Sequence, residues 1–296
     1  FADVKSLEGV ADTKHKAVPT FALPTTAGTA AEVTINYVII DEDARKKMVC
    51  VDPNDIPAVA IVDPELMYSM PKGLTAATGM DALTHAIESY ITPGAWAMSD
   101  MFELKAIEMI AQNLKAAVDN GKDTVAREAM SQAQYIAGMG FSNVGLGIVH
   151  SMAHKTGAAF ADYGAHIIHG AANAMYLPKV IKFNSKDPTA KKRYGQIADF
   201  IHLGGKNDDE KVDLLIAMLR KMNDDLNIPH CIKNYGADSY PCDQGFVPEK
   251  VFLERLPEIA VNAIGDACTG SNPRQPSPAE MEKLLKCCYY DTEVDF

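Results

Sequence analysis

The sequence lacks the features that would direct it to a membrane, a nucleic acid or an oxidising compartment. It has no apolar run near twenty residues, so we expect no membrane span, and it has no run of five basic residues. Its 28 Lys and Arg against 39 Asp and Glu give a net charge of −11, which repels nucleic-acid backbones and anionic membranes. None of its six cysteines forms a C-x-x-C pair, so we expect a reduced, cytoplasmic chain.

Several short catalytic and nucleotide-binding motifs are also missing. The chain has neither G-x-G-x-x-G nor G-K-[ST], the common phosphate-binding patterns. It has no G-x-S-x-G elbow, and Ser151 between His150 and Met152 is not a credible triad nucleophile. The composition, 47% hydrophobic and 23% charged over 296 residues, is that of a folded globular protein. The chain begins with Phe1 and not with Met, which is expected of a processed protein or a fragment.

The first seventy residues have the pattern of short β-strands. Residues 18–24 and 32–40 are rich in apolar and β-branched side chains. An acidic turn at residues 41–43 is expected to join the second of these runs to a return strand at 46–51, which forms a hairpin. The compact apolar run at residues 58–63 is typical of a buried parallel strand.

After Pro71 the pattern becomes helical almost throughout, with apolar residues at three- and four-residue spacing. Asp187-Pro188 and Ser277-Pro278 each place a capping residue before a proline at the first helical position. The expected helices cover residues 74–90, 95–118, 125–143, 148–158, 170–183, 188–202, 210–227, 248–264 and 278–290. We therefore expect a β-containing piece, residues 1–70, followed by an all-helical domain, residues 71–296.

Five polar side chains stand out in these otherwise apolar helices. Asp81 and His85, and also His150 and His154, are four residues apart, so each pair projects from one face of its helix. His169 follows at the start of another predicted helix. Unpaired polar groups are costly to bury, and one Asp with three His suits Fe(II) or Zn(II). We predict a metal centre; the alternative is a set of hydrogen-bonded core residues or a solvated helix face.

A small loop rich in threonine and alanine, residues 24–32, follows the first predicted strand. Its backbone amides and threonine hydroxyls are suited to contact a nucleotide. A plain loop after a strand has a similar composition, so this stretch alone leaves both interpretations open.

At these residues the sequence resembles the iron-containing (group III) alcohol dehydrogenases. The likeness covers essentially the whole chain, and the paired helical motifs around Asp81 and His150 are highly specific. The matching stretches are residues 1–9, 24–41, 51–53, 76–88, 138–147, 150–154 and 268–274.

The resemblance implies a fold and a set of site residues. The fold is an α/β remnant of a dinucleotide-binding domain, residues 1–70, followed by an all-α metal-binding catalytic domain, residues 71–296, of the dehydroquinate synthase-like type. His154 corresponds to an additional histidine that does not bind the metal and is expected to relay a proton. The implied metal ligands are Asp81, His85, His150 and His169. The implied NAD(P) contacts are Thr25, Thr26, Gly28, Thr29, Lys47 and Leu66, and the implied substrate pocket contains Asn36, Phe141 and Cys268.

The sequence departs from the family pattern at two places. The family's Gly-Gly-Gly-Ser phosphate-binding turn lies upstream of the segment that matches Phe1. We therefore expect roughly the first hundred residues of the dinucleotide-binding domain to be absent, and the chain to bind NAD(P) poorly. The segment before His169 is longer than in the branch that the chain resembles most, and it contains a competing histidine, His166. We choose His169 because Gly170 and Asn173 anchor the family motif.

The activity implied by the resemblance is a metal-dependent, NAD(P)-linked interconversion of a small primary alcohol or diol and its aldehyde, of the lactaldehyde/1,2-propanediol type. In this hypothesis the metal, Fe(II) with Zn(II) as the alternative, acidifies the alcohol so that an alkoxide forms and hydride passes to the nicotinamide. The expected partners are the small alcohol or aldehyde and, in the full-length protein, a second copy of the chain. Glu88, about one turn beyond His85, either orients that histidine or lies on the surface.

Three other interpretations stay open at this point. The first is a zinc-dependent enzyme that resembles glycerol dehydrogenase or dehydroquinate synthase. The second is a truncated, non-catalytic, metal-binding helical domain, and the third is a purely structural helical domain with core histidines. The residues also leave open NAD or NADP, and 1,2-propanediol, 1,3-propanediol, ethanol or butanol.

Overall fold

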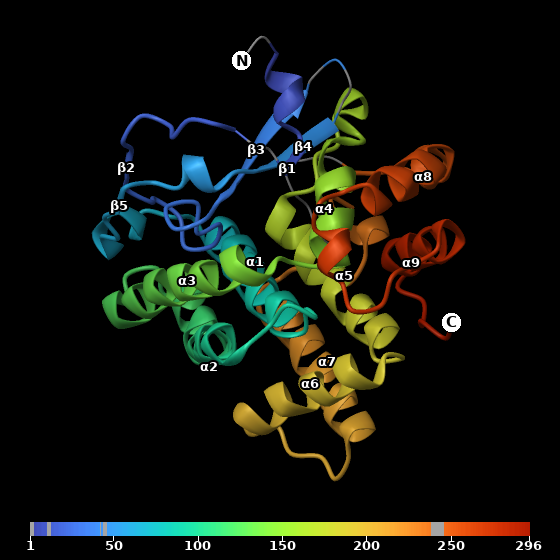
Figure 1. Ribbon diagram of the computed structural model, residues 1–296. Coiled ribbons are helices and arrows are strands. Elements are labelled where there is room, and N and C mark those ends of the chain that lie inside the picture. Colours follow the sequence, from blue (N-terminus) through green and yellow to red (C-terminus); the bar gives the residue numbers. More distant parts are fainter. Residues whose placement is uncertain (1–2, 11–12, 42, 44–45, 238–245) are drawn as a thin grey trace.

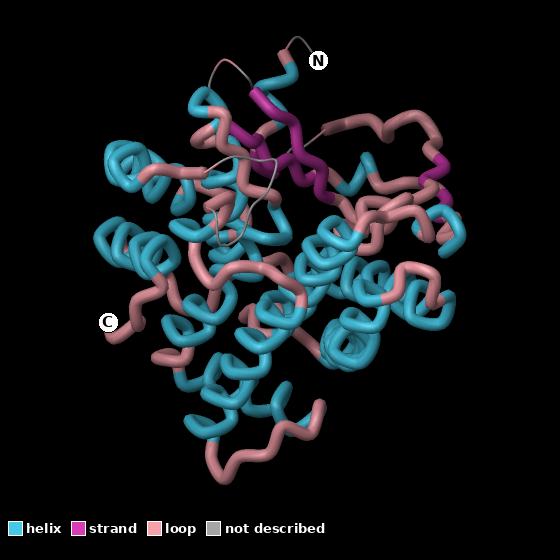
Figure 2. Tube along the Cα trace, turned by 180° about the vertical axis from the view of Figure 1, so that it is seen from behind, coloured by secondary structure: helices cyan, strands magenta, loops and turns pink. Residues whose placement is uncertain are grey.

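Strands and α-helices occupy separate parts of the chain (Figure 1). The structure is a computed structural model that describes residues 3–10, 13–41, 43, 46–237 and 246–296. Within these residues every strand lies before residue 61 and every α-helix after residue 71. Figure 2, seen from behind, shows the strands gathered at one end and the helices filling the rest.

The strands form two small sheets. They are β1 (Gly9–Val10), β2 (Phe21–Ala22), β3 (Asn36–Asp41), β4 (Lys46–Val51) and β5 (Val59–Ala60). β3 and β4 pair antiparallel, which confirms the predicted hairpin, and β1 joins the other edge of β4 in parallel. β3 begins four residues later than predicted because the buried side chain of Glu32 turns inward and accepts a hydrogen bond from Gln134. Glu42 of the predicted turn lies outside the described residues.

The second sheet corrects one expectation. β2 and β5 pair in parallel, with Phe21 opposite Val59, as expected of the run at residues 58–63. The predicted burial of that run is wrong: Val59 is 40% exposed and Ile61 is 45% exposed. Across the described part of the chain these two strands pair only with each other, so they form a separate two-stranded sheet.

The helices agree closely with the apolar periodicity of the sequence. Asp187 accepts a hydrogen bond from the amide of Ala190, and Ser277 forms a capping box with Glu280, so both predicted proline-containing starts are confirmed. The helices are α1 (Lys72–Tyr90), α2 (Ala97–Asp119), α3 (Thr124–Val144), α4 (Ile148–Ala158), α5 (His169–Asn184), α6 (Pro188–Phe200), α7 (Asp208–Asp225), α8 (Glu249–Ile264) and α9 (Pro278–Tyr290). None of these helices is both long enough and apolar enough to cross a bilayer.

α1 and α5 form the centre of the helical part (Figure 1). α1 is buried on nearly every face from Thr75 to Tyr90 and packs against α2, α3 and α5. The first turn of α5 touches the backbone of α1, since a Cβ on Gly170 would lie 1.9 Å from the carbonyl oxygen of Ala77. Only glycine permits this approach, and it brings the start of α5 beside the middle of α1.

A proline inside α5 is matched by a partner from another helix. Pro178 has no N–H, so the carbonyl of Ala174, four residues earlier, loses its helical hydrogen bond. The buried side chain of Asn223 on α7 donates to that carbonyl at 2.8 Å. The periodicity of the sequence therefore predicts this helix correctly despite the proline, because tertiary packing supplies the missing donor.

α2 carries a buried carboxyl group, Glu103, on the face that packs against α3. Its side chain packs on Gly140 of α3, where a Cβ would lie 1.9 Å from Oε1. Among the described residues neither carboxylate oxygen has a hydrogen-bond partner. Burial raises the pKa of Glu103 well above its usual range, so the folded protein favours the neutral acid.

We predict that Glu103→Gln makes the stability of the protein less dependent on pH. Above about pH 4.3 the unfolded chain releases a proton that the folded chain retains. The free energy of unfolding of the wild type therefore falls as the pH rises, by up to about 1.4 kcal/mol per pH unit. Urea unfolding from about pH 5 to about pH 8 is expected to show a growing advantage of the variant. Glu108→Gln, on a partly exposed carboxyl of the same helix, is the control, and equal pH slopes for Glu103→Gln and the wild type would contradict the prediction.

Candidate metal centre

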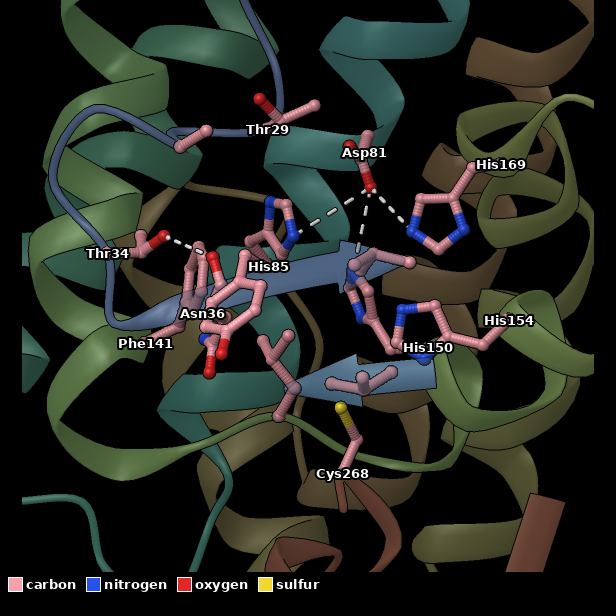
Figure 3. Close-up of a pocket in the computed structure, with 15 residues that line it drawn as sticks. Thr29, Thr34, Asn36, Asp81, His85, Phe141, His150, His154, His169 and Cys268 are labelled. Atoms are coloured by element: carbon pink, nitrogen blue, oxygen red, sulfur yellow. Dashed lines mark hydrogen bonds and ion pairs between the residues drawn. The ribbon is translucent and has the colours of Figure 1, made fainter. Parts of the chain in front are cut away.

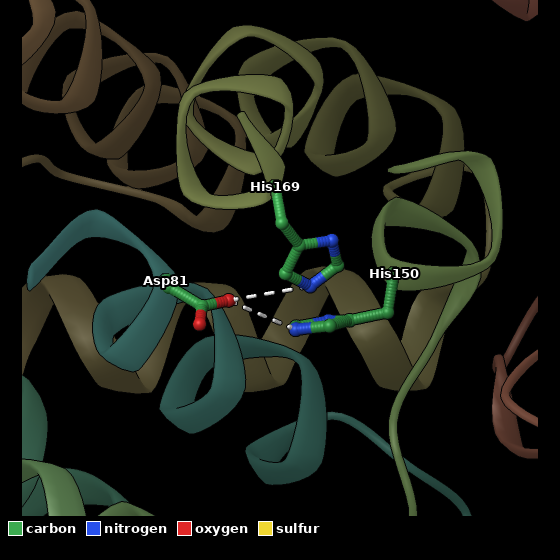
Figure 4. A group of neighbouring side chains, drawn as sticks. All are labelled: Asp81, His150 and His169. Atoms are coloured by element: carbon green, nitrogen blue, oxygen red, sulfur yellow. Dashed lines mark ion pairs between the residues drawn. The ribbon is translucent and has the colours of Figure 1, made fainter. Parts of the chain in front are cut away.

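A buried carboxylate, Asp81, lies where three imidazoles converge. Its Oδ1 is 3.5 Å from Nε2 of His150 and 3.5 Å from Nε2 of His169. Figure 4 marks both ion pairs with dashed lines. Nε2 of His85, one turn along α1, is 3.8 Å from the same oxygen. The groups come from α1, α4 and α5, so segments almost ninety residues apart in the sequence meet at one point.

The spacing of these atoms fits a metal ion. Ligands about 2.1 Å from a tetrahedral ion lie about 3.4 Å from one another, close to the observed separations. Asp81, His150 and His169 form a group whose ligand atoms all lie within 4.8 Å of one another, and His85 lies at its margin. The amide of Asn173, which the sequence analysis does not assign to the site, donates to Asp81 Oδ1 at 2.7 Å and lies 3.3 Å from Nε2 of His150. The NH₂ group of Asn173 therefore faces the electron pairs of Asp81 and His150 that a bound cation would use.

Electrostatics keep most of these groups ready to bind a cation. Burial opposes ionisation of Asp81, but His85, His169 and His150 hold the pKa of its carboxyl well below its usual range. Burial lowers the pKa of His85 to about 3 and lowers the pKa of His169 well below its usual range, which favours neutral rings. Burial acts in the same direction on His150, but hydrogen bonds from its ring to Asp81 and Glu88 raise its pKa to about 9. Metal binding at His150 then displaces a proton, so metal affinity is expected to rise with pH.

Glu88 supports the site from behind His150. Its Oε2 accepts a hydrogen bond from Nδ1 of His150 at 2.6 Å, and its Oε1 accepts one from the amide of Val149 at 2.7 Å. The amide of Gly147 donates to Oε2 at 3.1 Å, so one carboxylate both satisfies the start of α4 and turns Nε2 of His150 toward Asp81. The sequence predicts that Glu88 either orients His85 or lies on the surface; both expectations are wrong, because the buried Glu88 side chain faces α4 and contacts His150.

We predict that Glu88→Gln lowers the affinity for a divalent metal by about 10- to 100-fold. A glutamine amide group presents hydrogens to the α4 amides or to the His150 ring, where only an acceptor fits. Competition with a chelator for Co(II) or Zn(II) measures the change. Glu254→Gln, on the exposed face of α8, is the control, and unchanged affinity in Glu88→Gln would show that the carboxylate does not position the ring.

A cavity of about 300 Å³ opens beside the histidines (Figure 3). Its walls include the three residues that the sequence assigns to the substrate pocket: Asn36 on β3, Phe141 on α3 and Cys268 after α8. The Phe141 ring stacks on His85 with centroids 4.3 Å apart. Much of the remaining wall is apolar: Val38, Val49 and Leu146. The cavity is therefore small, mostly apolar and lined at one end by the Asp81 cluster.

The six predicted nucleotide contacts lie in different places. Thr29 lines the cavity, whereas Thr25, Thr26, Gly28, Lys47 and Leu66 are not part of its wall. Gly28 packs against α1, where a Cβ would lie 2.5 Å from the carbonyl oxygen of Thr78. Burial lowers the pKa of Lys47, whose Nζ lies close to Gly157 on α4. Leu66, in the 3-10 helix Pro64–Met67, is 41% exposed.

His154 lies next to the cluster and belongs to a separate network. Its ring is parallel to that of His169, with centroids 5.1 Å apart, and its Nδ1 is 3.2 Å from Oδ2 of Asp266. The ammonium of Lys155 is 2.8 Å from the same oxygen. Burial opposes ionisation of Asp266, but His154 and Lys155 hold the pKa of its carboxyl well below its usual range. Asp266 and Lys155 have no place in the sequence-based assignment, since neither forms a local motif.

The structure separates the two candidate histidines between α4 and α5. His166 is exposed, whereas Nε2 of His169 reaches the Asp81 cluster.

We predict that His169→Ala lowers metal content at least tenfold, because it removes a ligand, and that His166→Ala leaves it unchanged. Elemental analysis of the two purified variants measures the difference. Loss of metal from His166→Ala alone would overturn the assignment.

Comparison with known proteins gives matches along the chain. A family model described as iron-containing alcohol dehydrogenase matches residues 2–64. A second model, for the C-terminal part of the Fe-containing alcohol dehydrogenase family, matches residues 75–289. The strand-containing and the helical part therefore match models of the same group of proteins.

Individual relatives agree with these models. The chain is 47% identical to lactaldehyde reductase of Escherichia coli (strain K12) over 286 residues, 96% of the chain and 69% of the relative. It is 48% identical to the NADPH-dependent butanol dehydrogenase of Clostridium saccharobutylicum, covering 100% of the chain and 71% of the relative. The solved structures of a 1,3-propanediol oxidoreductase and of an alcohol dehydrogenase from Oenococcus oeni each give a TM-score of 0.85 at 34% identity, covering 97% of this chain and 70% of the other. The predicted fold class, a small α/β part before an all-helical domain, is confirmed.

Proposed function

The chain belongs to the iron-containing alcohol dehydrogenase family, whose members oxidise alcohols or reduce aldehydes, and we propose that it interconverts a short primary alcohol or diol with its aldehyde, using NAD(P). The observation that carries the proposal is the Asp81 cluster at one end of a cavity of about 300 Å³. That volume, with mostly apolar walls, suits a substrate of a few carbon atoms whose hydroxyl faces the cluster. Relatives named for lactaldehyde, butanol and 1,3-propanediol support a substrate of this size.

In this proposal Asp81, His85, His150 and His169 hold a divalent metal, Fe(II) in keeping with the family. When bound, the metal supplies Lewis-acid polarisation of the alcohol or carbonyl oxygen, and the nicotinamide supplies the hydride acceptor or donor. Glu88 orients His150 from behind, through Nδ1 of that ring, and the side-chain amide of Asn173 fixes Asp81 by donating to its Oδ1. The donor set itself supports this assignment: it is one carboxylate with three imidazoles, of which two favour the neutral form and the third, His150, can release its proton to a metal.

The other residues have roles in binding and proton transfer. We assign the walls of the substrate site to Asn36, Phe141 and Cys268, which exclude water and limit chain length. His154 lines the same cavity and is suited to accept the hydroxyl proton and to return it in the reverse direction. We propose that the nucleotide is contacted by Thr25, Thr26, Gly28, Thr29, Lys47 and Leu66.

The proposal includes the domain organisation and the setting of the protein. Residues 1–70 would form the C-terminal part of a nucleotide-binding domain, and residues 71–296 the metal-binding catalytic domain. Cys50, Cys231, Cys268, Cys287 and Cys288 are free thiols, which agrees with a reducing cytoplasm, and Cys242 lies outside the described residues. We propose a homodimer as the working assembly of the full-length protein.

A metal-exchange experiment tests the function. We predict that removal of metal by a chelator lowers turnover of 1,2-propanediol, ethanol or 1-butanol at least about 100-fold, because the oxygen of the substrate loses its polarising charge. Ferrous salt added without oxygen is expected to restore activity, and exposure to air to remove it again. Assays run with both NAD⁺ and NADP⁺ on the protein purified without oxygen.

The other outcomes separate the alternatives. Restoration by zinc and not by iron would favour the zinc-dependent enzyme. Stoichiometric iron with no turnover of any short alcohol, at NAD(P) concentrations raised to offset the weak binding expected of this chain, would contradict the enzymatic proposal and favour a metal-binding domain. His166→Ala, which keeps the exposed loop and removes only its imidazole, is the matched control for activity.

A further inference from the structure

A second carboxylate lies behind a second histidine. The side chain of Asp266 is fully buried at the end of α8, and its Oδ2 is 3.2 Å from Nδ1 of His154 and 2.8 Å from Nζ of Lys155. Its Oδ1 accepts a hydrogen bond from the amide of Cys268 at 3.0 Å. Lys155 is buried as well, and its Nζ donates to the carbonyl of Lys47 on β4 at 3.1 Å. Three donors from two segments, α4 and the residues just after Asp266, therefore converge on one carboxylate.

These contacts determine which nitrogen of His154 carries the proton. An ionised carboxylate only accepts hydrogen bonds, so Nδ1 of His154 must be the donor to Asp266. A neutral ring with its proton on Nδ1 has its free electron pair on Nε2. His154 lines the cavity that we assign to the substrate, so the residue that carries this electron pair borders the substrate site.

Lys155 argues against a second metal at this place. Ligand atoms of His154, Asp266 and Cys268 lie within 4.8 Å of one another, as they would around an ion. The ammonium of Lys155 already lies against the same carboxylate oxygen and balances its charge. A divalent cation there would meet a buried positive charge within a few ångströms, so the group forms a hydrogen-bond network and not a metal site.

We propose that Asp266, neutralised by Lys155, is a positioning residue that holds His154 as its Nδ1–H tautomer with Nε2 free to take a proton. The inference rests on the proposed alcohol chemistry for its purpose. During oxidation the hydroxyl proton of the alcohol would move to Nε2, and a bound nicotinamide would accept the hydride from the carbinol carbon. The ring then carries a proton on both nitrogens, and Asp266 stabilises that cation. In the reverse reaction the same proton returns to the oxygen.

The contact with Cys268 makes Asp266→Asn an informative variant. The amide of Cys268 donates to Oδ1, so an asparagine must place its carbonyl oxygen there. Its NH₂ group then occupies the place of Oδ2 and faces His154 and Lys155. The histidine is forced to accept at Nδ1, which moves its proton to Nε2 and removes the free electron pair. The asparagine NH₂ group would also face the ammonium of Lys155, and two donors repel each other. The double variant Asp266→Asn/Lys155→Met removes this repulsion.

Nitrogen-15 NMR of the metal-free full chain, with labelled histidine, tests the tautomer directly. We expect a protonated Nδ1 for His154 in the wild type and a protonated Nε2 in Asp266→Asn and in Asp266→Asn/Lys155→Met. In the metal-loaded protein we expect kcat to fall by about 10²- to 10⁴-fold, with KM changed by less than about threefold and metal content unchanged. Asp213→Asn, at an exposed ion pair with Lys182, is the control.

The readouts distinguish this inference from the proposed function. A wild-type His154 with its proton on Nε2, or an Asp266→Asn variant that keeps both the Nδ1–H tautomer and full turnover, overturns the inference. The expected exchange of tautomers in a protein that oxidises no alcohol supports the positioning role and overturns only the proposed activity. If Asp266→Asn alone fails to fold, the double variant without the buried ammonium gives the same comparison.

Discussion

The helical part of the structure is arranged around one buried negative charge, the carboxylate of Asp81. A charge that is removed from water needs partners of opposite polarity, and the surrounding helices supply them as imidazoles and an amide. α1 is buried on nearly all sides, and Gly170, the second residue of α5, lets the first turn of that helix reach α1. Close helix packing and the placing of ligands are thus the same structural requirement.

Two histidines of the site are each backed by a carboxylate, and the two carboxylates have different surroundings. Glu88 lies among backbone amides at the start of α4 and fixes His150, a predicted ligand, in one orientation. Asp266 lies against the ammonium of Lys155 and holds a ring that is stacked beside the cluster without joining it. A carboxylate behind a histidine therefore serves two purposes: Glu88 directs the His150 ring at Asp81, and Asp266 leaves Nε2 of His154 free.

The helices and much of the site could be predicted because their signals are local. Apolar spacing and proline caps gave helix ends within about two residues for most helices, and the four-residue spacing of Asp81 and His85 placed both on one face. The partners that complete the site come from distant segments: Lys47 and Asp266 contact Lys155 from places more than one hundred residues away in the sequence. The burial of β5 could not be predicted, because the apolar composition of residues 58–63 does not determine whether another layer of the structure covers the strand.

The cavity has two kinds of wall, and they differ in how freely they can diverge. The helical wall carries the ionisable groups, and glycines such as Gly147 hold it so tightly that an added Cβ would lie 2.6 Å from Glu88. The opposite wall comes from the hairpin of β3 and β4, where Asn36, Val38 and Val49 line the cavity. Evolution, or a protein engineer, can therefore reshape the hairpin to admit a longer or more polar molecule while the reactive half stays unchanged. One scaffold can in this way diversify into enzymes with different substrate ranges.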